Sequence, residues 1–539
     1  MPMFENVLKK LLDVNGYKGF ALNVLLGALS VLGHAPFYLW PVTLLCFALL
    51  MLRLDKAHNN TRSLRSGFWC GFAFAFGYFL AGLYWIGSAF IARGPEFVPF
   101  MPFAILLMSA GLALFWGVAG LAYVRLSRVG ASSMWRAGIF ACVFFIAEFL
   151  RGHVFSGFPW NLPGYIFAAG KPVSQIAAIV GIYGITALVF FLSASLGIVI
   201  ERRQNWVPVA VSTAILAACF SFGVVRLVNA EVQYVEDVKL RIVHANIPQR
   251  DKFDPNKYVS TANTYLNLSR SEGFEDVTHI IWPEGAIPGL MFEDQGLLAA
   301  IDNMFRSGNR QDTKQPPIFI TQSLRAEPKP GSSKTAYYNA AAAVTFRDGQ
   351  APEISSYYDK QKLVPFGEFI PGGGLLEKVG LHSLSTALES MTPGENGGVP
   401  ALPGLPPVSL QICYEIIFPG FTARAQPQNG QRPNWILNLS NDSWYGNSTG
   451  PRQHINQARY RAIEQGLPVV RATSGGVSGT IDSYGRQLKK LAPGEQGVID
   501  ARLPKPLTKT VYSSRVNYIM LLLIVILLIE CVRGMRRKL

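Results

Sequence analysis

The chain has 539 residues, of which 50% are hydrophobic and only 15% are charged, and its mean hydropathy is +0.24. Soluble proteins carry about 25% charged residues, so this composition excludes a wholly soluble protein and indicates one that is partly embedded in lipid. The net charge of +15 would suit a nucleic acid or an anionic membrane surface, and the positions of the basic residues decide between them.

Seven apolar runs follow a short polar start, and each is close to the roughly 20 residues that a membrane-spanning helix needs. They lie at 19–34, 36–54, 66–92, 98–125, 135–152, 172–200 and 206–228. Hardly a charge interrupts them, so we predict membrane spans rather than buried helices of a large soluble core. Glycine, alanine and serine recur inside them, which favours close helix packing. An eighth run at 518–531 would bring the chain back across the membrane.

Lysine and arginine gather in the loops on one side of these runs, which predicts their orientation. That side holds Lys9, Lys10, Lys18, Arg53, Lys56, Arg62, Arg65, Arg125, Arg128, Arg136, Arg202 and Arg203. The other side holds only Arg93, Arg151 and Lys171. We therefore expect both termini in the cytoplasm and the segment after residue 229 outside. The basic residues then set the topology, and no nucleic-acid partner is expected.

These observations predict a seven-helix membrane domain over 1–234, a soluble α/β domain over 235–510, and a final helix with a basic tail over 511–539. Strands of the soluble domain are expected at 238–247, 279–283, 317–322, 340–345, 354–363, 408–413, 435–441, 468–472 and 479–483. Helices are expected at 257–271, 296–306 and 450–465. Strands that alternate with helices indicate an α/β fold, although the strand order is not readable from their spacing.

The six cysteines include one in the soluble domain, Cys413, so no disulfide can form within that domain. No Cys-x-x-Cys pair or Cys/His cluster is present, and we expect neither a metal nor a cofactor. Cysteine is among the most buried residue types, so Cys413 taken alone is better interpreted as core filler than as a nucleophile.

Three stretches of the soluble domain end a strand with a polar residue that a core would not choose. Glu284 follows Trp282 and Pro283, Lys360 lies in 358–368, and Cys413 ends 408–413. A thiol needs a base to become a thiolate, and a cation or backbone N–H groups to hold the oxyanion that it creates. These residue types supply those roles, although a surface glutamate and a solvated lysine are the simpler interpretation of each one singly.

Together, the three stretches resemble the nitrilase superfamily. The matching motifs are Trp282-Pro283-Glu284, the stretch from Tyr358 through Lys360 to Pro365-Phe366-Gly367-Glu368, and Cys413-Tyr414-Glu415, with a further match at 438–446. The resemblance implies an αββα sandwich. It also implies that Glu284 is the general base, Lys360 holds the oxyanion and Cys413 is the nucleophile.

The membrane part, with its stretch at 148–161, is similar to that of the apolipoprotein N-acyltransferases, and this resemblance covers nearly the whole chain. It implies transfer of an acyl chain from a phospholipid, typically phosphatidylethanolamine, to the α-amino group of the N-terminal diacylglyceryl-cysteine of a lipoprotein. The implied route is ping-pong through a Cys413 thioester. The implied location is the bacterial inner membrane, with the catalytic domain in the periplasm.

Other residues are candidates for supporting or substrate-binding roles. Glu368 and Glu415 either act directly or orient Lys360 and a backbone turn. Tyr414 is expected to shape the pocket. Glu148 and Arg151 could pair and face a lipid headgroup, although Arg151 could also extend to the interface.

Keeping water from the thioester would need a cover, which we assign as a hypothesis to the Gly/Pro-rich segment 371–407 and to 290–292. Three residues differ from those usual in the related families: Lys362 where soluble nitrilases usually carry histidine, Gly285 where serine is common in the acyltransferases, and Phe253 where tryptophan is frequent. These differences bear only on the preference for the acceptor or the acyl chain. His454 has no ligand-spaced partner and is expected to be structural.

Two other functions stay open at this point. A membrane-anchored amidase or nitrilase would use the same three residues with water on a small amide, although such a substrate does not require eight spans. A transporter or scaffold with an inactive domain would leave these three residues unexplained, and its spans would be expected to carry more ionisable residues.

Overall fold

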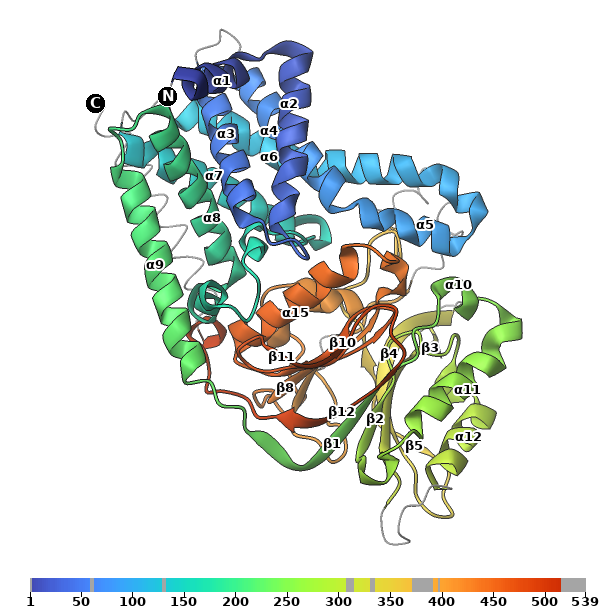
Figure 1. Cartoon of the computed structure of the whole chain (residues 1–539). Helices are drawn as coiled ribbons and strands as arrows, with labels where there is room; N and C mark the ends of the chain where they lie inside the picture. Colours follow the sequence, from blue (N-terminus) through green and yellow to red (C-terminus); the bar gives the residue numbers. More distant parts are fainter. Residues whose placement is uncertain are drawn as a thin grey trace. The chain divides into compact units, whose positions relative to one another are not determined.

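The computed structural model describes residues 2–58, 63–127, 132–306, 315–329, 335–370, 391–395 and 398–514. They form two compact units (Figure 1). One comprises Met1–Ala230 together with the described residues from Lys509 on, and the other is Glu231–Thr508.

The first unit is helical. Its helices are α1 (Pro2–Asp13), α2 (Gly16–Ser30), α3 (Trp40–His58), α4 (Ser63–Gly82), α5 (Gly87–Arg93), α6 (Met101–Ser127), α7 (Ser133–His153), α8 (Ala177–Glu201) and α9 (Val207–Val228). Glycines allow the close packing that the sequence predicts. A Cβ on Gly27 of α2 would lie 1.9 Å from Phe74 O of α4, and one on Gly71 of α4 would lie 2.2 Å from Trp116 O of α6.

Five described helical segments are long and apolar enough to cross a membrane, or six if a bent pair counts as one span. That pair joins Ser63–Gly82 to Tyr84–Arg93 at an angle of 48°, within the run predicted as a single span. The predicted number of eight spans is not confirmed. The run at 36–54 forms α3, whose last turns carry Arg53, Asp55 and Lys56, and the run at 518–531 lies outside the described residues.

The second unit contains two sheets. The first has the order β12-β1-β2-β3-β4-β5, with β6 also pairing with β4, and the second has the order β11-β10-β9-β8-β7. The bounds of the first are β1 (Tyr234–His244), β2 (His279–Ile281), β3 (Ile318–Pro328), β4 (Thr335–Thr345), β5 (Glu353–Ile354), β6 (Tyr358–Asp359) and β12 (Gly497–Pro504). Those of the second are β7 (Val408–Ile412), β8 (Trp435–Asn441), β9 (Val469–Ser474), β10 (Ser478–Ile481) and β11 (Gln487–Leu491).

Helices cover the outer faces of the two sheets, which gives the expected αββα sandwich (Figure 1). Helices α11 (Tyr258–Ser269) and α12 (Gln295–Arg306) pack their apolar sides on the first sheet, where Tyr265 and Phe305 are fully buried. Helix α15 (Gly450–Gln465) lies along the second sheet. Parallel pairing of β1 with β2 and of β7 with β8 brings the carboxyl ends of neighbouring strands to the same edge, where α/β folds place ligand sites.

Most predicted elements of this unit agree with the structure, and Trp435–Asn441 and Gly450–Gln465 have the expected bounds. The single strand predicted at 354–363 is wrong, because the chain forms the two short strands β5 and β6 instead. Ser355 separates them: its backbone N–H donates to Ala343 O, and its hydroxyl accepts from Ala343 N–H in place of a strand carbonyl. Strands β10 and β11 form a hairpin, and β11 and β12 were not predicted from the sequence.

The segments expected to cover the site are only partly described. Residues 371–390 and 396–397 of the predicted cover lie outside the described residues. Met291 and Phe292 are 1% and 4% exposed and belong to the hydrophobic core beside β2 and β3. Their packing is therefore that of core residues, and it does not support the hypothesis that they cover a thioester.

Candidate active site

Glu284 lies just beyond β2, where the parallel ladder ends. The N–H of Trp282 still donates to Ile320 O at 2.9 Å, and Pro283, which has no N–H, follows. Trp282 is fully buried against Tyr265, with ring centroids 4.8 Å apart, so the strand end is firmly held. This anchor delivers the Glu284 carboxylate, which is 8% exposed, to the carboxyl edge of the sheet.

Lys360 follows β6 directly and is 1% exposed. Its Nζ donates to Glu368 Oε1 at 2.8 Å and lies 3.7 Å from Glu284 Oε1. Burial lowers the pKa of this lysine, but the Glu368 and Glu284 carboxylates and Cys413 outweigh burial, so the pKa lies above its ordinary value. Lys360 is therefore a fixed cation between two carboxylates.

Cys413 stands at the end of β7 and begins a 3₁₀ turn, Cys413–Ile417. Its φ of 49° lies in the left-handed region, a strained conformation that often marks functional residues. Burial raises the pKa of the thiol to about 12; the Glu284 carboxylate adds to this rise and Lys360 opposes it. The thiol is thus protonated near neutral pH, and it needs a base to become a nucleophile.

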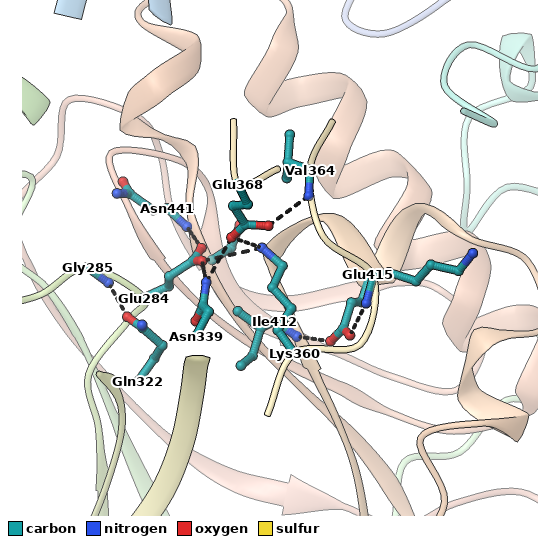
Figure 2. A network of polar contacts seen from close by, with 12 residues as sticks. Glu284, Gly285, Gln322, Asn339, Lys360, Val364, Glu368, Ile412, Glu415 and Asn441 are labelled. Carbon is teal, nitrogen blue, oxygen red and sulfur yellow. Dashed lines mark hydrogen bonds and ion pairs between the residues drawn. The ribbon is translucent and has the colours of Figure 1, made fainter. Parts of the chain in front are cut away.

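Two asparagines hold Glu284 (Figure 2). Asn339 Nδ2 donates to Glu284 Oε1 at 2.8 Å and also to Glu368 Oε1 at 3.0 Å. The backbone N–H of Asn441 donates to Glu284 Oε2 at 2.8 Å. Asn339 was not among the predicted site residues, although a polar side chain beside the alanine run 340–343 of a buried strand was an available signal.

Glu368 and Glu415 bind groups around Lys360 (Figure 2). Glu368 accepts from Lys360 through Oε1 and from the N–H of Val364, at 2.7 Å, through Oε2. Glu415 Oε1 accepts from the N–H groups of Gln361 and Lys362, and its Oε2 accepts from Ile412 N–H and Tyr358 OH. These are the contacts of orienting residues: Glu368 fixes the lysine, and Glu415 ties the lysine segment to the strand that ends at Cys413.

A buried charge cluster lies behind Cys413. Asp442 Oδ2 is 2.8 Å from Arg471 Nη2, and Asp442 Oδ1 is 3.0 Å from His454 Nδ1; all three side chains are fully buried. Burial raises the pKa of Asp442, but Arg471 and His454 outweigh it, so the pKa lies below its usual range. His454 was expected to be structural, and this cluster gives it a partner that the sequence did not reveal.

The other candidates lie as follows. Tyr414 is buried with its ring against Phe418, at 4.9 Å between centroids. Glu148 and Arg151 form the predicted ion pair at 2.6 Å, but both side chains are fully buried, and Trp116 Nε1 also donates to Glu148. These contacts are internal to the helical unit. The prediction that Glu148 and Arg151 face a lipid headgroup therefore has no support from the described geometry.

The three residues that differ from the usual family residues make contacts with their neighbours. The Phe253 ring lies 5.7 Å from that of Trp444, and Lys362 Nζ lies 5.1 Å from the Phe418 ring centre. Gly285 has a φ of 62° and donates its N–H to Gln322 Oε1, and a Cβ there would meet Asn441 Nδ2 at 2.8 Å. In the described parts of the chain, no group of three His, Cys, Asp or Glu side chains is placed to hold a metal ion.

The arrangement supplies a protonated thiol, a carboxylate that can take its proton, and a cation that can hold an oxyanion. These are the parts needed for acyl transfer through a covalent intermediate. The geometry alone does not distinguish water from an amine as the second acceptor.

Comparison with known proteins makes that distinction. Residues 26–195 match the family described as "Apolipoprotein N-acyltransferase N-terminal domain", and residues 239–512 match "Carbon-nitrogen hydrolase". Proteins named apolipoprotein N-acyltransferase from Rhodopseudomonas palustris and Bradyrhizobium diazoefficiens are 38% and 36% identical over 515 and 510 residues. The matches cover 92% of this chain in both cases, and 92% and 91% of the two relatives.

A third relative of the same name, from Caulobacter vibrioides, is 36% identical over 500 residues, covering 90% of this chain and 89% of its own length. Both units of the chain are matched, which supports an acyltransferase over an anchored amidase. The apolar helices and the shared name fit a bacterial membrane protein with lipid and lipoprotein substrates. The chain belongs to the apolipoprotein N-acyltransferase family, and it is an acyltransferase enzyme.

Proposed function

We propose that this enzyme moves an acyl chain from a phospholipid, phosphatidylethanolamine as the expected donor, to the α-amino group of a lipoprotein's N-terminal diacylglyceryl-cysteine. Cys413 is the nucleophile, Glu284 the general base and Lys360 the oxyanion cation. The observation that carries these roles is the buried Glu284–Lys360 contact of 3.7 Å, together with the influence of both charges on the Cys413 thiol.

In the first half-reaction, Glu284 takes the thiol proton and the Cys413 sulfur attacks the ester carbonyl of the phospholipid. Lys360 and a backbone N–H beside Cys413 stabilise the tetrahedral oxyanion. The carbon–oxygen bond then breaks, and Glu284 returns the proton to the departing alkoxide. The products are an S-acyl thioester and a lysophospholipid.

In the second half-reaction, the lipoprotein amine attacks the thioester carbonyl and Glu284 takes a proton from the attacking nitrogen. The carbon–sulfur bond breaks, an amide is formed, and Glu284 returns its proton to the departing sulfur, which restores the Cys413 thiol. Glu284 therefore has to be ionised at the start of each half-reaction.

Both substrates are lipid-anchored, so the helical unit would hold the site at a bilayer surface. The excess of basic residues in one set of loops supports a domain 1–234 and a segment 511–539 in the inner membrane, with cytoplasmic termini. The catalytic domain 235–510 would then be periplasmic.

The test is the intact mass of the purified enzyme after incubation with phosphatidylethanolamine and no acceptor, beside a Cys413→Ala variant. We expect a hydroxylamine-sensitive acyl adduct on the wild type alone, which a diacylglyceryl-cysteine peptide discharges while becoming N-acylated. Turnover of small amides without any acyl adduct would refute the proposal.

A further inference from the structure

A second buried lysine lies beside the site, and the proposed mechanism does not use it. Lys252 ends the short helix α10 (Gln249–Lys252), and its side chain is 5% exposed. Its Nζ donates to Asn441 Oδ1 at 3.3 Å. Within the described part of the chain, no carboxylate forms an ion pair with it. Burying a cation without a paired anion is costly, so its presence here calls for a reason.

Asn441 connects this lysine to the general base. Its Nδ2 donates to Gln249 Oε1 at 2.9 Å, so the two ends of α10 together fix the orientation of the amide. The backbone N–H of the same residue donates to Glu284 Oε2 at 2.8 Å (Figure 2). The position of the Asn441 N–H that donates to Glu284 therefore depends on α10.

The charges around Glu284 come from several elements. The titratable or charged side chains that interact with it or with the thiol beside it are those of Lys252, Lys360, Cys413, Asp442 and Tyr445. Glu368 interacts with Lys360, and His244 interacts with Lys252. Lys360 lies on the side of Oε1, and Lys252 reaches Oε2 through Asn441. Glu284 is thus linked to a lysine at each of its two oxygens, directly to Lys360 and through Asn441 to Lys252.

The charge of Lys252 responds to that of Glu284. Burial lowers the pKa of Lys252 to about 7, and the Glu284 carboxylate opposes this lowering. The ammonium of Lys252 and the Glu284 carboxylate therefore interact favourably.

We propose that Lys252 is a positioning residue for acyl transfer: through Asn441 it fixes the backbone N–H that donates to Glu284 Oε2, and its ammonium supplies a favourable charge near that carboxylate. This inference rests on the proposed role of Glu284 as general base. Because Glu284 has to accept a proton in both half-reactions, Lys252 supports both without itself being assigned a contact with the substrates.

The test is the single-turnover rate of Cys413 acylation by phosphatidylethanolamine, measured from pH 5 to 9 on the full-length enzyme in detergent. Lys252→Gln removes the charge but keeps a donor for Asn441, whereas Lys252→Met removes both. Lys257→Gln is the matched control, because Lys257 lies five residues away in an exposed pair with Asp251. Thermal unfolding of each variant reports whether the fold is retained.

We expect both Lys252 variants to move the acid limb of the rate profile upward by about one pH unit, since a favourable charge is lost. Lys252→Met should also lower the maximal rate by about 10- to 100-fold, the usual effect of losing an orienting partner. The Lys257→Gln profile should match that of the wild type. If Lys252→Met does not fold, the profile of Lys252→Gln decides.

An acid limb that stays at its wild-type pH in the folded Lys252 variants overturns the inference, because a merely structural lysine would change stability alone. Glu284→Gln separates this failure from that of the proposed function. Wild-type acylation by Glu284→Gln would refute the general base itself. An inactive Glu284→Gln beside unshifted Lys252 variants would refute only the role of Lys252.

Discussion

The ammonium of Lys360 is closer to Glu368 than to the proposed base, with Nζ at 2.8 Å from Glu368 Oε1 and 3.7 Å from Glu284 Oε1. The Glu368 carboxylate is the largest influence that raises the pKa of Lys360 against the effect of burial. Lys360 therefore stays charged over the whole working pH range. It can stabilise an oxyanion, but it is poorly suited to carry protons, which leaves that task to Glu284.

Replacing Lys360 tests this division of roles. Lys360→Met should lower the rate of Cys413 acylation by about 100- to 1000-fold, because the oxyanion loses its cation and two carboxylates are left facing each other. Stopped-reaction mass spectrometry measures the rate. Lys239→Met, which removes an exposed partner of Asp276, is the control and should acylate normally. Retained acylation in Lys360→Met would contradict the assigned role.

Removing the Glu368 charge should change how the rate of Cys413 acylation depends on pH at alkaline values. In Glu368→Gln, Lys360 loses the charge that raises its pKa, so the lysine deprotonates at lower pH and the acylation rate should fall at an alkaline pH where the wild type is still active. The maximal rate should fall by about 10- to 100-fold. Glu353→Gln, in an exposed pair with Arg347, should leave the profile unchanged. An alkaline limb that does not move would show that Glu368 does not tune Lys360.

The sequence was enough to predict elements whose pattern is local. The buried strand Trp435–Asn441 and the helix Gly450–Gln465 have clear periods and clear ends, and their bounds agree with the structure. The division of 354–363 could not be predicted, because it depends on the hydroxyl of Ser355 replacing a backbone group opposite Ala343. The sequence does not show that the Ser355 hydroxyl takes this place, because the contact arises only when the strands pair.

The same limit applies to the site. Glu284, Lys360 and Cys413 lie in motifs that can be read along the chain. Asn339 reaches Glu284 only because β4 pairs with both β3 and β6, and Lys252 approaches only because α10 lies over the end of β8. Spacing in the sequence contains neither relationship, so the contacts of Asn339 and Lys252 could not be predicted, whereas the motif residues can be read along the chain.

The reactivity of Cys413 should depend steeply on pH. The pKa of the thiol is raised to about 12, so the thiolate is a small fraction at pH 7 and grows about tenfold per pH unit. Alkylation by a small neutral reagent should therefore accelerate through pH 7 to 9, with Cys413→Ala as the background for the other cysteines. A rate that is flat over this range would indicate a resting thiolate and remove the need for a base in the first half-reaction.

Substitutions of Glu148 and Arg151 in the helical unit can show whether this ion pair stabilises the fold or binds a lipid headgroup. Arg151→Met should destabilise the enzyme by about 3–5 kcal/mol, because it leaves Glu148 buried without its partner. The double variant Glu148→Gln/Arg151→Met should recover part of this loss. If the pair is structural, the KM for phosphatidylethanolamine in the double variant should equal that of the wild type, as followed by N-acylation of a diacylglyceryl-cysteine peptide. A raised KM with normal stability would instead support the headgroup contact.

The buried Asp442 should make the catalytic domain sensitive to acid. Because Arg471 and His454 hold the pKa of Asp442 below its unfolded value, the native state favours the ionised carboxylate. This stabilisation is complete above the unfolded pKa of about 4 and is lost as the pH falls through the lower native pKa. Asp442→Asn should cost about 3–5 kcal/mol near neutral pH, since Arg471 stays buried without its anion, and the deficit should shrink in acid. Denaturant unfolding followed by tryptophan fluorescence measures the difference, with the exposed Asp276→Asn as the control. A deficit that is the same at pH 3 and pH 7 would mean that the cost comes from packing and not from the charge.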